Sequence, residues 1–254
     1  MTGTPRPCKP HLEVVAFDYR LPNLTEALKR QRKIKIVAIG SSSTAGTNGI
    51  VPFPHRLELA LRSRFYGRMI DVLNRGIGGQ EAPEELARFE CDVIAEMPSL
   101  VIWQVGTNAV FRKIDYNFDD VERAIAVGLS WLATLPADVV LMDLQLTRAI
   151  VERNVPPGPG QKPLADDIVD RISAVAASAQ VNLFKRWALM NTWRDTDGVA
   201  LTEMDDGVDP FLHTGEWATQ CIANAFDLAI AAAVEPVAGA PAPPIGNSNQ
   251  DEII

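Results

Sequence analysis

Short apolar runs rich in β-branched residues alternate with amphipathic helical stretches along most of this chain. The apolar runs 33–39, 69–73, 99–105, 138–144 and 181–184 are each followed by small or polar turn residues. Strands that are joined through helices pair in parallel, and each crossover is right-handed. The alternation therefore predicts an α/β fold, a three-layer α/β/α sandwich with one doubly wound parallel sheet of five strands. The predicted helices are 52–65, 81–97, 118–135, 164–178 and 214–234.

The length of 254 residues suits one domain of this kind, which we place at 33–234. Residues 1–32 precede the first strand and are expected to form an arm that packs on the domain. The segment 154–163 is too rich in proline and glycine for regular structure and is predicted to be a loop. The Ala/Pro-rich stretch 235–254 is expected to be a flexible tail.

The charge balance and the apolar runs limit the partners of the chain. Its 32 acidic and 24 basic residues give a net charge of −8, which disfavours nucleic acid as a partner. No apolar run approaches the ~20 residues of a membrane span, and residues 1–17 lack the apolar stretch expected of a signal peptide. The location is periplasmic or secreted if the start is a trimmed mature form, and otherwise cytoplasmic. The sequence leaves the oligomeric state open.

The three cysteines are too few and too scattered for a disulfide scaffold or a zinc site. Cys91 falls in an amphipathic stretch and is predicted to be a small core residue. Cys8 and Cys221 could join the arm to the last helix in an oxidising compartment, and the sequence leaves this pairing open.

Small and polar residues follow the first three predicted strands. The first runs into Gly-Ser-Ser-Ser at 40–43, the second into a turn with three glycines between 76 and 79, and the third into Gly-Thr-Asn at 106–108. The first turn lacks the lysine of a P-loop and the glycine spacing of a dinucleotide fingerprint. It can present a nucleophilic serine or simply cap a helix. Together the three turns offer a hydroxyl, a backbone N–H and an amide, which is the set that acyl transfer requires.

A base for such a serine must come from three histidines. His11 lies in the arm, and His55 is expected to be a surface residue of the first helix. His213 precedes the last helix and follows three aspartates, at 205, 206 and 209. The chain order Ser…Asp…His is one of the orders in which catalytic triads occur.

The turn residues resemble the conserved blocks of the SGNH/GDSL hydrolase superfamily, over roughly residues 34–223. IVAIGSSSTAG resembles the first block and places the nucleophile at Ser42, with Ser41 where the family has aspartate. NRGIGGQ resembles the second block, and its oxyanion glycine maps to Gly79. WQVGTNAV resembles the third, with Asn108 as the side-chain donor of the oxyanion hole. The resemblance implies a flavodoxin-like sandwich.

The fourth block departs from the family pattern Asp-x-x-His. One frame puts Asp209 where histidine belongs, and the other keeps His213 as the base. We prefer the second frame because an aspartate cannot serve as the neutral base that takes the serine proton and returns it. The acid is then Asp209, or Asp206 reached across a small insertion.

The resemblance implies a serine-dependent ester hydrolase, a GDSL-type esterase or O-deacetylase that works through an acyl-serine intermediate. Ser42, His213 and Asp209 (alternatively Asp206) would form the triad, and the donors at Ser42, Gly79 and Asn108 the oxyanion hole. The expected substrate is a small acyl ester or an acylated carbohydrate, with no metal and no organic cofactor. Gln145, after the fourth strand, is a candidate for the substrate rim or an ordinary loop residue. The alternatives are an acyltransferase, a non-catalytic carbohydrate- or ligand-binding protein of the same fold, and a flavodoxin-type nucleotide binder.

Overall fold

The computed structural model describes residues 6–235 and contains a single parallel sheet. Its strand order is β2-β1-β3-β4-β5, with all neighbours parallel, so the predicted doubly wound sandwich with five strands is confirmed. The strands are β1 (Lys33–Gly40), β2 (Met69–Gly76), β3 (Leu100–Gln104), β4 (Asp138–Met142) and β5 (Asn182–Phe184).

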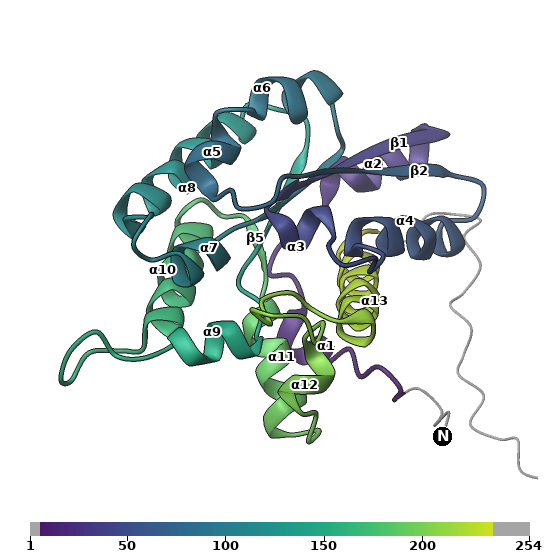
Figure 1. Cartoon of the computed structure of the whole chain (residues 1–254). Coiled ribbons are helices and arrows are strands. Elements are labelled where there is room, and N and C mark those ends of the chain that lie inside the picture. The colour runs from purple at the N-terminus through teal and green to yellow at the C-terminus, as the bar shows by residue number, and fades with distance from the viewer. Residues whose placement is uncertain (1–5, 236–254) are drawn as a thin grey trace, which may run out of the picture.

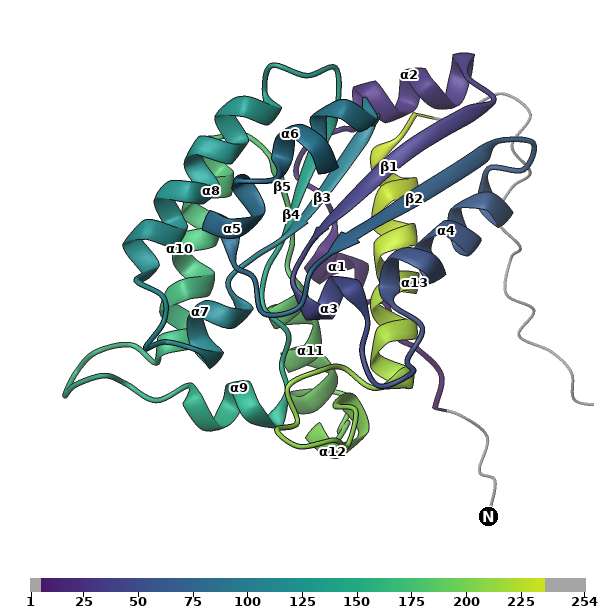
Figure 2. The ribbon, with the colours of Figure 1, turned by 45° about the horizontal axis from the view of Figure 1, so that its top comes forward.

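Helices cover both faces of the sheet, as Figures 1 and 2 show. On one face α4 (Phe53–Arg64) and α13 (Glu216–Ala233) pack against each other, and on the other lie α5 (Ala82–Leu86), α8 (Phe118–Leu132) and α10 (Leu164–Ser178). The remaining helices are α1 (Leu12–Val15), α2 (Pro22–Arg30), α3 (Ser42–Ala45), α6 (Phe89–Asp92), η1 (Ile94–Glu96), α7 (Thr107–Phe111), α9 (Arg148–Arg153), α11 (Arg186–Asp195) and α12 (Leu201–Met204).

The register of the sheet brings the functional turns to one edge. Gly40 at the end of β1 pairs with Gly76 at the end of β2, and Ile39 pairs with Trp103 of β3. Since the strands are parallel, the chain leaves them at the same edge of the sheet, where ligands bind in folds of this type. The three turns predicted from the sequence are therefore neighbours in space.

β3 lies in the core of the molecule, which is why its sequence is almost entirely apolar. Every residue of β3 is buried, because helices cover the central strand on both faces. On the α13 side, Phe226 stacks on Phe184 at 4.4 Å between ring centroids and packs edge-on against Phe17 at 5.8 Å. This aromatic cluster fixes α13 on the sheet, and α13 begins directly after the loop that carries His213.

The predicted helix 81–97 is wrong as a single element. The chain forms the short helices α5, α6 and η1 instead, because the backbone leaves the helical region at Arg88 and again at Val93. The Arg88 side chain turns towards the sheet edge and donates to Gln80 Oε1 and to the carbonyl of Gly40. The prediction for Cys91 is also wrong, since this cysteine is exposed on α6.

Several short helices were not predicted. In the segment taken as an arm, α2 starts at Pro22 and buries Leu24, Ala27 and Leu28. After β5, α11 buries Trp187 and Trp193. The proline start and the apolar spacing of α2 were available in the sequence, whereas α7, α9 and α12 are too short to show a helical period.

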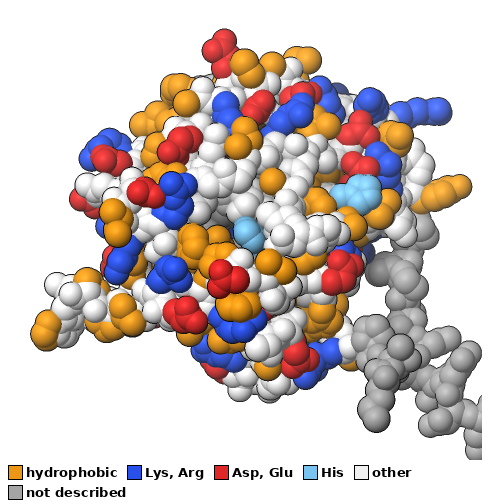
Figure 3. Space-filling view, in the orientation of Figure 1, with side chains coloured by type: hydrophobic (Ala, Val, Ile, Leu, Met, Phe, Trp, Pro, Cys, Tyr) orange, Lys and Arg blue, Asp and Glu red, His pale blue; other side chains and the backbone are white. Residues whose placement is uncertain are grey.

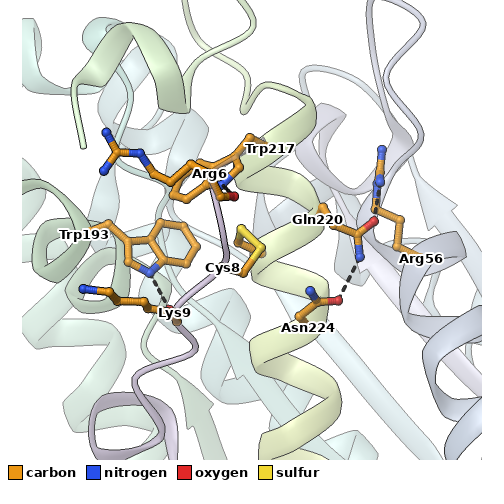
Figure 4. Close-up of a disulfide and its surroundings, with 9 residues drawn as sticks. Arg6, Cys8, Lys9, Arg56, Trp193, Trp217, Gln220 and Asn224 are labelled. Carbon is orange, nitrogen blue, oxygen red and sulfur yellow. Dashed lines mark hydrogen bonds between the residues drawn. A yellow bond between two sulfur atoms is a disulfide. The ribbon is translucent and has the colours of Figure 1, made fainter. Parts of the chain in front are cut away.

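The N-terminal segment is tied to the rest of the molecule by a disulfide and by tryptophan hydrogen bonds (Figure 4). Cys8 is bonded to Cys221 of α13, so the pairing left open by the sequence is present. Trp193 Nε1 donates to the carbonyl of Lys9 at 2.7 Å, and Trp217 Nε1 donates to that of Arg6 at 2.8 Å. These contacts hold residues 6–9 beside the first turns of α13.

Two features of the surface bear on possible partners. Among residues 6–235, no helix is long and apolar enough to cross a membrane. Acidic and basic side chains are interspersed over the face shown in Figure 3, so their charges largely offset one another there. The predicted flexible tail, apart from Glu235, lies outside the described residues.

We expect Cys8→Ser to lower the free energy of unfolding by about 2–4 kcal/mol, because the disulfide closes a loop with a sequence separation of 213 and restricts the unfolded chain. Urea denaturation of the oxidised proteins measures this difference, and a reductant should bring the wild type close to the variant. Cys91→Ser is the matched control and should leave the midpoint unchanged. Equal midpoints for the oxidised wild type and Cys8→Ser would contradict the prediction.

Candidate active site

Ser42 is the first residue of α3, on the tight turn that follows β1. The turn needs glycine at its start, since a Cβ on Gly40 would lie 2.5 Å from Thr44 Oγ1 and 3.0 Å from the Gln104 side chain. Because Ser42 opens the helix, its N–H lies outside the hydrogen bonds of α3 and is free to face a ligand. The turn therefore presents a hydroxyl and a backbone donor from the same residue.

A buried glutamine holds this turn from the neighbouring strand. Gln104, the last residue of β3, accepts at Oε1 from the Ser41 backbone N–H at 3.2 Å, from Ser41 Oγ at 2.9 Å and from Ser43 Oγ at 2.7 Å. Ser41 is buried and stands at the position of the family aspartate. The hydroxyls on both sides of Ser42 thus point at Gln104, and Ser42 alone of the three serines contacts a histidine.

His213 lies beside Ser42, as predicted. Its Nε2 is 2.9 Å from Ser42 Oγ, and its side chain is 18% exposed. Burial lowers the pKa of His213 below its ordinary value, and the Asp206 carboxylate opposes part of this shift. The imidazole is therefore neutral at pH 7 and can accept the serine proton.

The three aspartates before His213 have three different partners. Asp206 faces the histidine, with Oδ2 3.6 Å from His213 Nδ1, and its side chain is fully buried. Asp205 is also buried and binds Arg148 through both carboxylate oxygens. Asp209 is exposed in the turn before Pro210. The structure thus brings Asp206 to His213, not the first choice Asp209, because the turn at 207–210 carries Asp209 away.

Asp206 is oriented by two further donors. Asn48 Nδ2 donates to Oδ2 at 2.7 Å, and the N–H of Val208 donates to Oδ1 at 3.1 Å. The distance of 3.6 Å to His213 Nδ1 exceeds an ordinary hydrogen bond, and such contacts shorten when substrate binds.

The loop that carries His213 is fixed from the segment after β4. Arg148 binds Asp205 and also lies over the Phe211 ring, with Cζ 3.7 Å from the centroid. Gln145 Nε2 donates to the carbonyl of Leu212 at 2.6 Å. Gln145 is fully buried, so the structure places it behind the histidine loop and not on an exposed rim.

The predicted oxyanion donors are carried by the turns that follow β2 and β3. A Cβ on Gly78 would lie 3.8 Å from Ser42 Cβ, so the glycine turn after β2 adjoins the serine. Gly79 has a φ of 80°, a conformation that favours glycine, and among the described residues its N–H has no acceptor. Asn108 is buried on α7, and its Nδ2 donates to the carbonyl of Gln80 at 2.7 Å. One amide proton of Asn108 remains for a ligand.

A small cavity of about 10 Å³ borders Ser42 and His213 on the side lined by Gly46, Ile50 and Pro52. A much larger cavity of about 840 Å³ lies at the opposite edge of the sheet, by the starts of β4 and β5. Its buried polar side chains Asp138 and Asn182 are occupied by backbone groups of the N-terminal segment, so it offers no comparable chemistry.

Within residues 6–235, no group of three or more His, Cys, Asp or Glu side chains is placed to hold a metal ion. What the site does contain is a serine hydroxyl in contact with a neutral imidazole, a carboxylate behind the imidazole, and donors beside the hydroxyl. These groups can activate the serine as a nucleophile and stabilise an oxyanion.

The fold and this arrangement define an SGNH/GDSL-like hydrolase, which confirms the resemblance seen in the sequence. The model of the non-GDSL lipase-like family matches residues 7–236, and the chain belongs to this family. The family description agrees with the first block, where Gly-Ser-Ser-Ser replaces Gly-Asp-Ser-Leu.

Solved structures share the fold at low sequence identity. Axe2, an acetylxylan esterase from Geobacillus stearothermophilus, is 18% identical with a TM-score of 0.62, over 78% of this chain and 94% of that chain. A protein assigned to the lipolytic G-D-S-L family from Desulfitobacterium hafniense DCB-2 is 20% identical with a TM-score of 0.60, over 77% and 98%. LAE5, an alpha/beta hydrolase enzyme from the metagenome of Lake Arreo, is 19% identical with a TM-score of 0.61, over 80% and 97%.

A curated relative matches over a shorter stretch. The uncharacterized lipoprotein YqeF of Bacillus subtilis (strain 168) is 34% identical over 76 residues, which are 29% of this chain and 31% of that protein. The match thus spans less than a third of the length of this relative.

Sequence reasoning missed the residues that hold the site together. Gln104 carried a signal, because its amide interrupts the otherwise apolar run LVIWQV. The pairing of Arg148 with Asp205 had no signal in the sequence, since the two residues are 57 positions apart.

We expect Asp206→Asn to lower the pKa of His213 below that of the wild type, because the Asp206 carboxylate stabilises the imidazolium. Asp209→Asn is the matched control and should leave the pKa unchanged. An NMR titration of the histidine ring protons measures both, with His11 and His55 as internal references. If the pKa of His213 fell in Asp209→Asn and was unchanged in Asp206→Asn, Asp209 and not Asp206 would be the acid.

Proposed function

We propose that this protein is a serine-dependent ester hydrolase that works through an acyl-serine intermediate. The observation that carries the proposal is the contact of 2.9 Å between Ser42 Oγ and His213 Nε2, on a histidine whose burial keeps it neutral. Membership of the non-GDSL lipase-like family supports the same class of activity.

In the proposed mechanism Ser42 Oγ attacks the carbonyl carbon of the ester while His213 takes the hydroxyl proton. His213 then gives this proton to the leaving alcohol, which departs as the acyl-serine forms. Water attacks the acyl-serine with His213 as base again, and the acid and free serine are released. Asp206 holds the imidazole with Nδ1–H towards its carboxylate and stabilises the imidazolium.

The tetrahedral oxyanion would be stabilised by the N–H groups of Ser42 and Gly79 and by the Asn108 amide. This assignment is supported by the free N–H of Ser42 at the start of α3 and by the conformation of Gly79. Loss of one such donor typically lowers kcat by ~10²–10³.

The substrate class we propose is a short-acyl ester, with an acylated carbohydrate as the fitting natural form. The support for both parts of this proposal is the shared fold with an acetylxylan esterase.

The proposal predicts that Ser42→Ala loses at least ~10³-fold in kcat on p-nitrophenyl acetate, because the nucleophile is gone. Ser43→Ala is the matched control and should retain at least about a tenth of the activity, since its hydroxyl contacts Gln104 and not the histidine. A fluorophosphonate probe should label the wild type at Ser42, as located by mass spectrometry of the modified peptide.

Undiminished turnover by folded Ser42→Ala would refute the proposal. Absence of both turnover and labelling in the folded wild type would instead favour a carbohydrate- or ligand-binding protein of the same fold. Transfer of the acetyl group to an added alcohol in preference to water would favour an acyltransferase.

The proposed acyl size predicts that kcat/KM for p-nitrophenyl acetate exceeds that for p-nitrophenyl octanoate at least ~10-fold, since a site shaped for an acetyl group discriminates against extra methylenes. Initial rates on acetate, butyrate and octanoate esters below their micelle concentrations measure this. A rise of kcat/KM with chain length would contradict a short-acyl preference while leaving the serine mechanism intact.

A further inference from the structure

Glu81 is a buried carboxylate that lies between the two loops of the candidate oxyanion hole. It follows the glycine turn after β2 and is 1% exposed. Oε1 accepts from the N–H of Gly106 at 2.7 Å, and Oε2 accepts from the N–H of Ala109 at 3.0 Å. These two N–H groups flank Asn108, so both oxygens of Glu81 bind the turn that presents the amide.

The turn that carries Asn108 binds back to the glycine turn. Asn108 Nδ2 donates to the carbonyl of Gln80 at 2.7 Å. The carbonyl of Gly79 accepts from Arg112 Nη1 at 3.1 Å and from the Tyr116 hydroxyl at 2.9 Å. The carbonyl of Gly79 is thus held from the α7 side, and with it the Gly79–Gln80 peptide, which adjoins the peptide that carries the Gly79 N–H.

From this reciprocal set of bonds we propose that Glu81 is a positioning residue, which sets the separation and direction of the Gly79 and Asn108 donors. This inference rests on the proposed esterase mechanism. Glu81 touches no reacting atom and acts through the two loops. Oxyanion donors are effective only when they are preorganised at the place where charge develops, and a shared buried acceptor provides that rigidity.

A second buried glutamate, Glu85, lies one helical turn further along α5 and offers a comparison. Glu85 Oε2 accepts from Trp103 Nε1 at 2.7 Å, and its Oε1 has no partner among the described residues. Burial raises the pKa of Glu85 well above its usual range, and the nearby Glu81 charge adds to this effect. Burial also raises the pKa of Glu81, but backbone N–H groups donate to both of its oxygens and oppose this shift, whereas Glu85 accepts only from Trp103.

Because the hydrogen-bond partners of Glu81 and Glu85 differ, substitution by glutamine should affect the two positions differently. In Glu81→Gln one oxygen becomes an NH₂ group, which must face a backbone N–H of the Asn108 turn in place of an acceptor. In Glu85→Gln the amide oxygen can still accept from Trp103, and the NH₂ group replaces an oxygen without a partner. The two variants carry the same chemical change, so Glu85→Gln is the matched control.

The experiment measures kcat and KM on p-nitrophenyl acetate for Glu81→Gln, Glu85→Gln, Asn108→Ala and the double variant Glu81→Gln/Asn108→Ala. We expect Glu81→Gln to lower kcat ~10–100-fold with KM within about twofold, because an interaction made only in the transition state is weakened. Glu85→Gln should stay within about threefold of the wild type. In the double variant, the Glu81 substitution should cost less than it does alone, since its effect passes through Asn108.

Additive effects in the double variant, or equal losses in Glu81→Gln and Glu85→Gln, would overturn the positioning role. A large loss in Glu81→Gln that is accompanied by a fall in His213 pKa would also overturn it, since that would mark general disruption of the site. If instead the wild type is inactive, or Asn108→Ala retains full kcat, the proposed function or its oxyanion hole fails and not the role of Glu81.

Tyr116→Phe provides a test that does not depend on burying a new amide. The substitution removes the Tyr116 hydroxyl, which is part-buried and donates to the carbonyl of Gly79. We expect kcat to fall ~3–10-fold with little change in KM, as for one lost hydrogen bond of the set. Wild-type kcat in Tyr116→Phe together with wild-type kcat in Glu81→Gln would refute the proposal.

Discussion

The position of the candidate nucleophile depends on the hydrogen bonds between Gln104 and the serine turn. They join the end of β1 to the end of β3 and leave Ser42 as the serine whose hydroxyl contacts His213. In the superfamily an aspartate stands beside the nucleophile, whereas here Ser41 is buried and donates to Gln104. In this chain the serine at that position is thus held by an amide on the neighbouring strand.

The histidine side of the site depends on a different set of contacts, in a loop with little regular structure. Arg148 neutralises the buried Asp205 and covers Phe211, while Gln145 holds the carbonyl next to His213. A buried aspartate without such a partner would be costly, so the pairing with Arg148 decides which aspartate is left to face the histidine. The aromatic cluster under α13 and the disulfide to Cys8 then hold the helix that follows this loop.

The sheet could be predicted from the sequence because its signals are local. They are the alternation of apolar runs with amphipathic stretches and the glycines that follow the strands. The sequence also placed Ser42, Gly79, Asn108 and His213 at one edge. In the structure His213 contacts Ser42, the glycine turn adjoins Ser42 at Gly78, and Asn108 donates to the carbonyl of Gln80. The sequence could not choose among the aspartates, because the choice is made by Arg148 and by a turn that carries Asp209 into solvent. The break of the helix at Arg88 was equally hidden, since its cause is a side chain that reaches the carbonyl of Gly40 across the fold.

Buried carboxylates are costly: burial raises the pKa of both Glu81 and Glu85, and the Glu81 charge raises that of Glu85 further. Apolar residues at both positions would pack the same helices without this cost. The backbone N–H groups that Glu81 accepts are, however, at the start of α7, where no helical acceptor exists. A charged acceptor there satisfies the helix and the turn at once, and it does so from the loop that carries Gly79. The same bond that caps α7 therefore couples the two proposed oxyanion donors, so that neither loop can shift without the other.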